Sequence, residues 1–536
     1  MKKRTLFSVF LTFVMFVTAS ISLFACSCGG SNKIVLKDPS EDENKSIKIS
    51  LNCEGDVRAS YEILIEEFNA VYDANVTASF TSDSDVYWQQ LDSAISAKNA
   101  PDVFYCDPSS VRQFANKNGA LPLDTYLQYE IDILDGKVSV NNDYPHIDYH
   151  DILSESIKYY TYNRETCTLG DGTIYAIPKD ASGYAMGYNK NVINKAVLMG
   201  RWPENLLFPW QYTDSEGGVY DDYASAKASG KTVSQVCYTW QQFVSACQAC
   251  QFTEASTGTK YYGTGLLDEW AMHSWIWTAG GDYISADGTT MTIKDEKFVQ
   301  GLQEFVDLHL KYDACQPYED SLSSSHYDKW KNGQVAFFSV GNWDIGAYDA
   351  IDSSILDYDV MPTPKKDADS EWYTYRGTLG FAVNKLTQSP TLATRLALWL
   401  SASGEVSNER IRYSSDSDLT DGIAKGAYNW LTKIKKVQLP NKTADLNTYL
   451  ADDTLRPTNK QVYADIVLGS NGKVYPSART YNDEWWEIFY GSIGKIWAGE
   501  NAEPEMTVRE YVEYINDSCQ EALTKSIRAE QKDSKR

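Results

Sequence analysis

Carboxylates are the side chains with which this sequence could most readily do chemistry. Its 536 residues include 73 Asp and Glu but only five His. Cleavage of a glycosidic bond needs two carboxyl groups at a suitable separation. The sequence does not fix that separation, and it contains no HExxH, GxSxG, GxGxxG or P-loop motif. An enzyme that acts on glycosides is therefore an open alternative, with no motif in its favour.

Metal binding and thiol chemistry have less support than carboxylate chemistry. Only His146 and His150 lie close together among the histidines, in a predicted loop. Cys247 and Cys250 recur at helical spacing after a capping box that begins at Thr239. This pattern predicts two thiols buried in a helix core rather than a metal or redox pair. We therefore expect no cofactor and no metal.

Composition narrows the class of partner. The chain carries 37 Tyr and 15 Trp, and flat apolar rings with polar edges suit the faces and hydroxyls of sugars. Its formal net charge of −24 repels phosphate backbones. The composition thus favours carbohydrate and argues against nucleic acid as a partner.

The N-terminus predicts export. Three basic residues precede an uncharged apolar run over residues 6–24, which is the organisation of a signal peptide over residues 1–25. Ala25-Cys26 resembles the end of a bacterial lipobox, which implies that Cys26 carries a lipid, although Phe24 stands where a small residue is usual. Simple secretion and a retained membrane anchor are the alternatives. Residues 26–45 are polar and predict a flexible tether.

The strands and helices predicted from residue 46 onward would position the functional side chains. Alternating apolar residues predict strands over 47–51 and 76–80, and a short third strand is predicted over 102–105 after Pro101. Helical spacing predicts helices over 61–72 and 87–95. This order predicts an α/β fold with a parallel sheet covered by helices. A second α/β set begins near residue 171, and residues 191–238 interrupt it as an insert that we expect near the rim of a cleft.

Several fragments together resemble the extracellular solute-binding proteins of carbohydrate ABC importers, the family that includes maltose-binding protein. Each fragment is weak alone, but their order and spacing are more specific. They are Glu66–Ala70, Ala100–Phe104, Asp171–Pro178, Tyr188–Lys190, Gly280-Gly281, Asn332–Ala336 and Gly341–Trp343.

The resemblance implies a two-lobed periplasmic-binding-protein-like fold with a hinge and a ligand cleft between the lobes. It would place 46–187 and 378–470 in lobe 1 and 188–377 and 471–536 in lobe 2, with crossovers at Tyr188–Lys190 and at the strand from Thr378. It also implies a monomer that gives an oligosaccharide to ABC permease subunits at the extracellular face of the membrane. A solute-binding protein that captures another polar solute instead of a sugar is the alternative within the same functional class.

Two carboxylates are expected at the cleft because of their place after strands. Glu54 follows the first predicted strand and Asp107 follows the third. Ligands of open α/β sheets bind beyond the carboxyl ends of the strands, so either carboxylate could accept sugar hydroxyls. A solvated or helix-capping acid is the alternative for each.

Aromatic candidates come from the resemblance. Trp343 and Asp344 directly follow an apolar strand, and Trp343 matches a stacking position of the family. Trp275 and Trp485 match two further stacking positions, with Trp277 and Trp486 as the respective alternatives. Tyr184 and Arg479 are additional expected ligand-binding residues, although either could instead fix the hinge.

Overall fold

The computed structural model describes residues 35–265, 268–317, 320, 323–401, 443–452, 456–497 and 504–535. The predicted signal peptide, Cys26 and the first part of the predicted tether lie outside these ranges. Within the part of the chain that is described, no helix is both long and apolar enough to cross a membrane.

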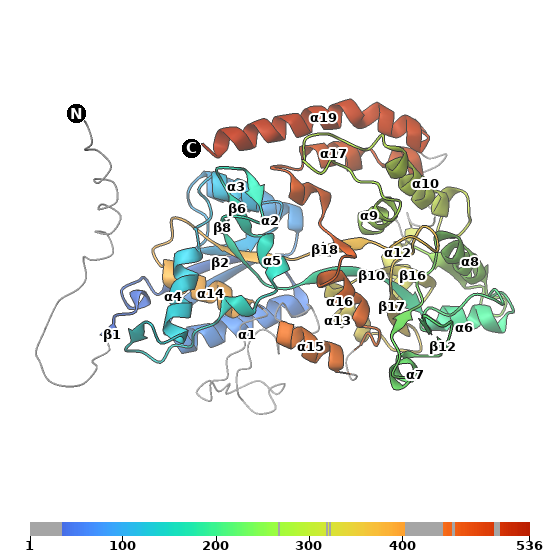
Figure 1. The fold of residues 1–536 in the computed structure, drawn as a ribbon, viewed down its shortest axis with the longest axis horizontal. Coiled ribbons are helices and arrows are strands. Elements are labelled where there is room, and N and C mark those ends of the chain that lie inside the picture. Colours follow the sequence, from blue (N-terminus) through green and yellow to red (C-terminus); the bar gives the residue numbers. More distant parts are fainter. Residues whose placement is uncertain are drawn as a thin grey trace, which may run out of the picture.

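Lobe 1 is built on a five-stranded sheet with the order β3-β2-β4-β19-β9, whose first strands are blue in Figure 1. The first three strands are parallel, and β19 runs antiparallel to both of its neighbours. The strand and helix pattern predicted over residues 46–105 is confirmed. The elements are β2 (Ser46–Asn52), α1 (Gly55–Tyr72), β3 (Asn75–Thr81), α2 (Ser84–Ser96), β4 (Val103–Cys106), β9 (Ala176–Pro178) and β19 (Gly380–Val383).

Helices cover this sheet and share one apolar core with it. Apolar residues of α1 recur at helical spacing, which turns one face of the helix toward the sheet. Trp399 on α14 (Pro390–Leu400) is fully buried, and its indole Nε1 donates a hydrogen bond to the Leu64 carbonyl at 2.8 Å. This lobe also contains α3 (Val111–Asn116), α4 (Asp124–Leu134) and α5 (Ser154–Lys158).

Lobe 2 is built on a seven-stranded sheet around β10 (Ser182–Asn189), all of whose residues are buried. The strand β10 pairs antiparallel with three strands along its length, so it is the central strand of the lobe 2 sheet. Its partners are β16 (Val335–Gly341), β17 (Tyr358–Met361) and β18 (Thr374–Gly377), and the sheet is completed by β14 (Phe252–Thr253), β15 (Lys260–Thr264) and β20 (Gly472–Lys473).

The helices of lobe 2 include one that the sequence predicts in detail. The capping box of Thr239 and Gln242 opens α8 (Trp240–Cys250), and Cys247 and Cys250 are both buried in its core, as predicted. The eight cysteines that the structure describes are free thiols. Neighbouring helices are α9 (Glu269–Thr278), α10 (Glu296–Leu310), α12 (His326–Lys331), α13 (Ile345–Asp349), α17 (Glu484–Gly491) and α18 (Gly494–Trp497).

Within the described residues, the chain passes between the lobes at two adjacent segments, residues 179–181 and 378–379, which join β9 to β10 and β18 to β19. Asp180 ties the two together: its Oδ1 accepts from the Leu379 amide at 3.1 Å, and its carbonyl accepts from Thr378 Oγ1 at 2.7 Å. Lys179 and Asp180 form an ion pair of 2.6 Å. The hinge is thus one hydrogen-bonded unit.

The lobe boundaries differ from the expected ones at the first crossover and in the segment after residue 442. Tyr188–Lys190 is not a crossover but the end of β10 and the start of α6 (Lys190–Leu198), which the Asn189 side chain caps. Residues 443–452 and 456–470 pack on lobe 2 rather than lobe 1, because α16 (Gln461–Val467) packs on β10 and α15 (Thr443–Ala451) packs on α16, and both helices share a core with β16.

Residues 35–45 belong to lobe 1, which differs from the expected tether. The strand β1 (Val35–Leu36) pairs with β5 (Ser139–Val140). Asp38 is buried and forms an ion pair of 2.8 Å with Arg395, which also contacts Glu130 at 2.7 Å. Asp38, which lies in the segment expected to be a tether, is thus the partner of a buried arginine.

The insert at 191–238 forms part of lobe 2 away from the lobe interface. Beyond α6 it contains a small antiparallel sheet and one short helix. Figure 1 shows these elements at the far side of lobe 2 from lobe 1. They are β11 (Tyr212–Asp214), β12 (Val219–Tyr220), α7 (Tyr223–Ala228) and β13 (Val233–Gln235).

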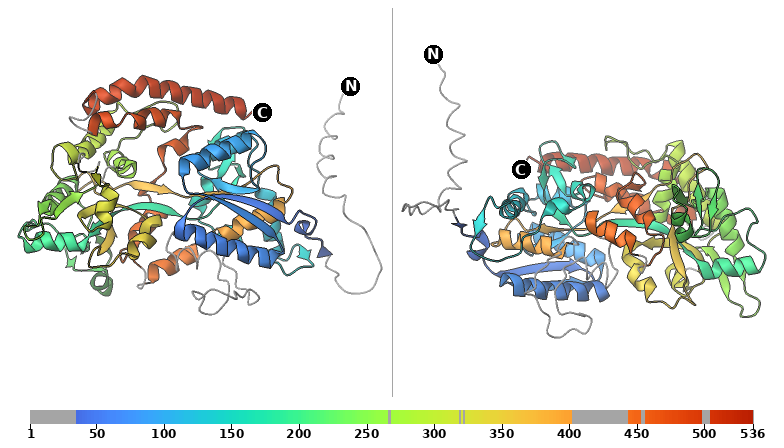
Figure 2. Two further views of the ribbon diagram at one scale, coloured as in Figure 1. Left: turned by 180° about the vertical axis from the view of Figure 1, so that it is seen from behind. Right: turned by 60° about the horizontal axis from the view of Figure 1, so that its bottom comes forward.

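The C-terminal helix α19 (Val508–Asp533) spans both lobes, as the red helix in both views of Figure 2 shows. Its first turns pack in the core of lobe 2. Near its end, Glu530 forms a 2.7 Å ion pair with Arg112 of α3 and accepts a hydrogen bond of 2.9 Å from the Tyr162 hydroxyl. The helix therefore joins lobe 2 to lobe 1 at a site separate from the hinge.

Candidate ligand-binding site

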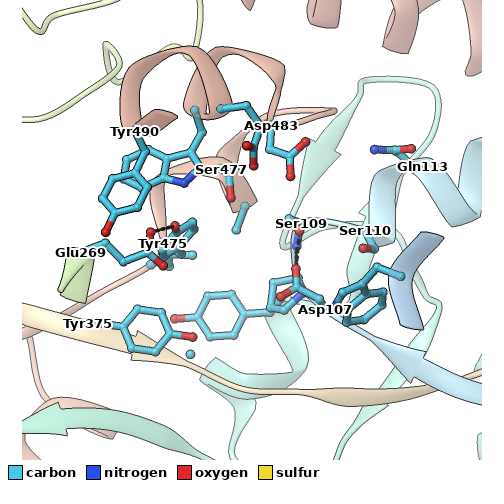
Figure 3. Close-up of a pocket in the computed structure, with 18 of the residues that line it drawn as sticks. Asp107, Ser109, Ser110, Gln113, Glu269, Tyr375, Tyr475, Ser477, Asp483 and Tyr490 are labelled. Atoms are coloured by element: carbon cyan, nitrogen blue, oxygen red, sulfur yellow. Dashed lines mark hydrogen bonds between the residues drawn. The ribbon is translucent and has the colours of Figure 1, made fainter. Parts of the chain in front are cut away.

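A cavity of about 960 Å³ lies between the two lobes. Lobe 1 contributes residues of α2, the loop after β4 and the start of α3, and lobe 2 contributes the start of α9, the end of β18, residues 474–478 and α17. The cavity thus lies beyond the carboxyl end of β4, where open α/β sheets bind ligands. Figure 3 shows the two walls, with Asp107 and Gln113 facing Tyr475 and Asp483.

Five aromatic residues line the lobe 2 wall. Trp270 in the first turn of α9 packs against Tyr375 and Tyr475, with ring centroids 4.4 and 5.4 Å away. Trp486 of α17 continues the wall, 5.4 Å from Tyr475 and stacked on Tyr490 at 5.3 Å. Rings with apolar faces and polar edges are suited to bind sugar rings.

Two carboxylates are held inside the cavity by defined hydrogen bonds. Asp107 accepts from the Ser109 amide at 2.6 Å and from the Ser109 hydroxyl. Glu269 accepts from the Tyr475 hydroxyl at 2.9 Å, a contact drawn in Figure 3. Each keeps lone pairs with which it could accept hydrogen bonds from ligand hydroxyls.

The electrostatic environment raises the pKa of both carboxyl groups. Burial raises the pKa of Asp107, against the hydrogen bonds from Ser109, and Asp483 on the opposite wall raises it further. Burial also raises the pKa of Glu269 to about 7; the Tyr475 hydrogen bond opposes this shift, whereas Asp268 and Glu487 add to it. The cavity therefore disfavours negative charge on its own acids.

Of the residues expected to bind ligand, Asp107 lines the cavity and three others lie in the core of lobe 2. Trp275 is 1% exposed and packs between Phe243 and Phe305. Trp485 is 0% exposed, and its Nε1 donates to Thr480. Tyr184 is buried, and its hydroxyl donates to Ser339.

The remaining expected residues lie outside the lining. Trp343 is 38% exposed and 5.9 Å from Trp270, so it extends the aromatic wall beyond the cavity. Asp344 accepts from Tyr327, and burial raises its pKa to about 6. Arg479 forms a 2.7 Å ion pair with Asp282, and Glu54 is exposed at the start of α1.

Several residues of the cavity lining were not among those expected from the sequence, and two of them lie close to expected ones. Trp270 lies five residues before the expected Trp275 on the same helix. Trp486 was the open alternative to Trp485, and it is the member of that pair that lines the cavity. Glu269, Tyr375 and Tyr475 had no sequence signal, because only the packing of distant segments brings them together.

Comparison with known proteins agrees with this architecture. The family model described as "Bacterial extracellular solute-binding protein" matches residues 54–406. A search of curated proteins finds no match.

Several solved structures share the fold at low sequence identity. An ABC substrate-binding protein from Listeria monocytogenes in complex with cycloalternan has a TM-score of 0.63 at 16% identity, covering 90% of this chain and 99% of its own. The GacH receptor of Streptomyces glaucescens, solved with acarbose, has a TM-score of 0.60 at 16% identity and the same coverage. The maltose-maltodextrin binding protein of Alicyclobacillus acidocaldarius has a TM-score of 0.57 at 14% identity, covering 88% of this chain and 99% of its own.

These similarities identify the two-lobed periplasmic-binding-protein fold, with its hinge between β9 and β10 and between β18 and β19. The matched region includes both crossovers of the hinge. The chain therefore belongs to the bacterial extracellular solute-binding protein family.

Proposed function

We propose that this protein captures an oligosaccharide between its lobes and delivers it to the permease of an ABC importer. The observation that carries the proposal is the cavity of about 960 Å³, in which an aromatic wall faces hydrogen-bonding carboxylates. Pockets for small ligands reach about 1,000 Å³, so this one has room for several sugar rings. Ligand that contacts both walls would favour the closed arrangement of the lobes.

The fold neighbours support the carbohydrate class. The Listeria protein was solved with cycloalternan and the Streptomyces receptor with acarbose. In this chain, Trp270 and Tyr490 would stack on sugar rings, and Asp107 would accept hydrogen bonds from sugar hydroxyls. Among the earlier candidates, Trp343 would extend the stacking surface at the mouth of the cavity.

The test is calorimetric titration with a panel of neutral oligosaccharides of different linkage. We expect at least one to bind and to raise the melting temperature. Trp270→Ala and Tyr490→Ala should each weaken that binding about tenfold, because each removes a stacking face. The matched control is Tyr514→Ala, since Tyr514 is exposed on α19 and does not line the cavity.

The same panel tests the rival enzyme. No carbohydrate binding to the purified full chain would refute the receptor. Release of new reducing ends from any glycan, lost in Glu269→Gln, would instead establish a glycoside-acting enzyme that uses a carboxyl with a raised pKa as its acid.

A lipid on Cys26 would keep the protein at the extracellular face of the membrane, beside its permease. The sequence Ala25-Cys26 supports this anchor. Mass spectrometry of the protein extracted from membranes should find a diacylglycerol on Cys26, and Cys26→Ala should release the protein into the medium. An unmodified N-terminus in the membrane fraction would refute the anchor and leave the binding function untouched.

A further inference from the structure

The cavity is strongly acidic. Its lining contains six carboxylates, and among the described lining residues Arg376 is the one cationic side chain. Lobe 1 contributes half of these acids and lobe 2 the other half. They are Asp85, Asp92 and Asp107 on lobe 1 and Glu269, Asp483 and Glu487 on lobe 2.

Most of this charge has no cation beside it. Lys117 pairs with Asp92 at 2.9 Å. Arg376 donates to the Tyr159 hydroxyl at 2.9 Å and to the Gly469 carbonyl at 3.4 Å, not to a carboxylate. Within the described part of the chain, the other five acids of the lining form no ion pair. No cationic side chain of the described residues therefore neutralises these five acids, and a cationic ligand could do so.

Acids of the two lobes affect each other across the gap. Asp483 of lobe 2 raises the pKa of Asp107 in lobe 1, after burial as the larger cause. After burial and Asp483, Asp85 of lobe 1 also raises the pKa of Glu487 in lobe 2. Closure brings like charges closer, so it is opposed unless a cation enters between them.

An organic cation fits this lining better than a metal ion. Among the residues that the structure describes, no group of three or more His, Cys, Asp or Glu side chains could hold a metal. The acids are instead interleaved with the rings of Trp270, Tyr475, Trp486 and Tyr490. Aromatic faces attract alkylammonium groups and also stack on sugar rings.

We propose that the preferred ligand is an oligosaccharide with free amino groups, whose ammonium groups lie between Asp107 on lobe 1 and Asp483 and Glu487 on lobe 2. This inference rests on the proposed carbohydrate-binding function and adds the charge of the ligand. The amine would supply the missing counter-charge, and the aromatic wall would hold the rings. The same acids would exclude uronic and sulfated sugars.

The experiment compares three tetrasaccharides by calorimetry: the β-1,4-linked glucosamine tetramer, its fully N-acetylated counterpart and maltotetraose. The glucosamine tetramer should bind at least about tenfold more tightly than the N-acetylated form, because acetylation removes the charge and leaves the linkage unchanged. Its affinity should fall with added salt more steeply than that of either neutral glycan.

Two variants on one helix locate the effect. Glu487→Gln should weaken binding of the glucosamine tetramer severalfold and change the affinity for a neutral glycan by a much smaller factor. Glu484→Gln removes the same charge from α17 at an exposed position outside the cavity, so it should change neither affinity. Asp483→Asn, on the turn before α17, should behave like Glu487→Gln.

The possible failures are distinguishable. Equal or tighter binding of the N-acetylated tetramer or of maltotetraose overturns the amino-sugar inference and leaves the carbohydrate receptor intact. Binding of spermidine with no binding of any glycan overturns the carbohydrate function itself. Equal losses in Glu487→Gln and Glu484→Gln overturn the placement of the ammonium group at the cavity.

Discussion

Replacing Glu269 by glutamine should stabilise the ligand-free protein at alkaline pH but not at acidic pH. The pKa of Glu269 is raised from its ordinary value of 4.5 to about 7, by burial and then by Asp268 and Glu487, against the Tyr475 hydrogen bond. Between these two values the folded protein binds more protons than the unfolded chain. Its stability therefore falls as the pH rises through this window, and the full cost is present above about pH 7.

The magnitude follows from the size of that pKa change. A tenfold change in proton affinity corresponds to about 1.4 kcal/mol, so the upper limit is about 3 kcal/mol. Water in the cavity screens the charge, which reduces the expected gain to about 1–2 kcal/mol. For a domain of this size, 1 kcal/mol shifts the melting temperature by about 2 °C, so Glu269→Gln should melt about 2–4 °C above the wild type.

The assay is differential scanning fluorimetry of both proteins from about pH 4 to about pH 8.5. The melting temperatures should agree at the acidic end and separate through about pH 5–7, because the substituted amide cannot ionise. Glu484→Gln, exposed on α17, is the control for loss of one negative charge. A difference that stays constant with pH, or one that Glu484→Gln reproduces, would refute the reasoning.

Further substitutions separate the roles of core packing, of the buried Arg395 ion pairs and of the contact between the lobes. Trp275→Ala should cost about 3–5 kcal/mol of stability by leaving a core cavity, whereas Trp270→Ala should chiefly lower glycan affinity; calorimetry and thermal melting distinguish the two. Arg395→Met should cost about 3–5 kcal/mol, seen as a lower melting temperature, because the buried carboxylates of Asp38 and Glu130 lose their arginine partner. Glu530→Gln should cost about 2–3 kcal/mol and speed amide hydrogen exchange at the end of α19; unchanged exchange there would contradict the contact with Arg112.

The elements of lobe 1 could be predicted from the sequence because their patterns are local. Alternation in Ile47, Ile49 and Leu51 directly reports a strand with one buried face. In β10 all eight residues are buried, so no alternation indicates to which sheet it belongs. The lobe boundary before Ser182 depends on the pairing of β10 with β16 and β18, and the local sequence does not indicate this pairing.

The candidate site was harder to predict for the same reason. In α9 every residue from Ala271 to Thr278 is buried, so periodicity cannot indicate which tryptophan reaches the cavity. Asp107 could be found because the residue after a parallel strand lies at the binding edge of the sheet. Asp38 had no such signal, since its buried partner Arg395 lies more than 350 residues away.

The second junction between the lobes restricts how they can move. The two crossovers at Asp180 and Thr378 are adjacent and act as one pivot. Two bodies joined at a single pivot can rotate about three axes, whereas two bodies joined at two separated points can rotate only about the line between them. The Glu530 contact at the end of α19 supplies the second point. While it holds, twisting of one lobe against the other is blocked and rocking about that line remains, which leaves the opening of the cleft a single degree of freedom.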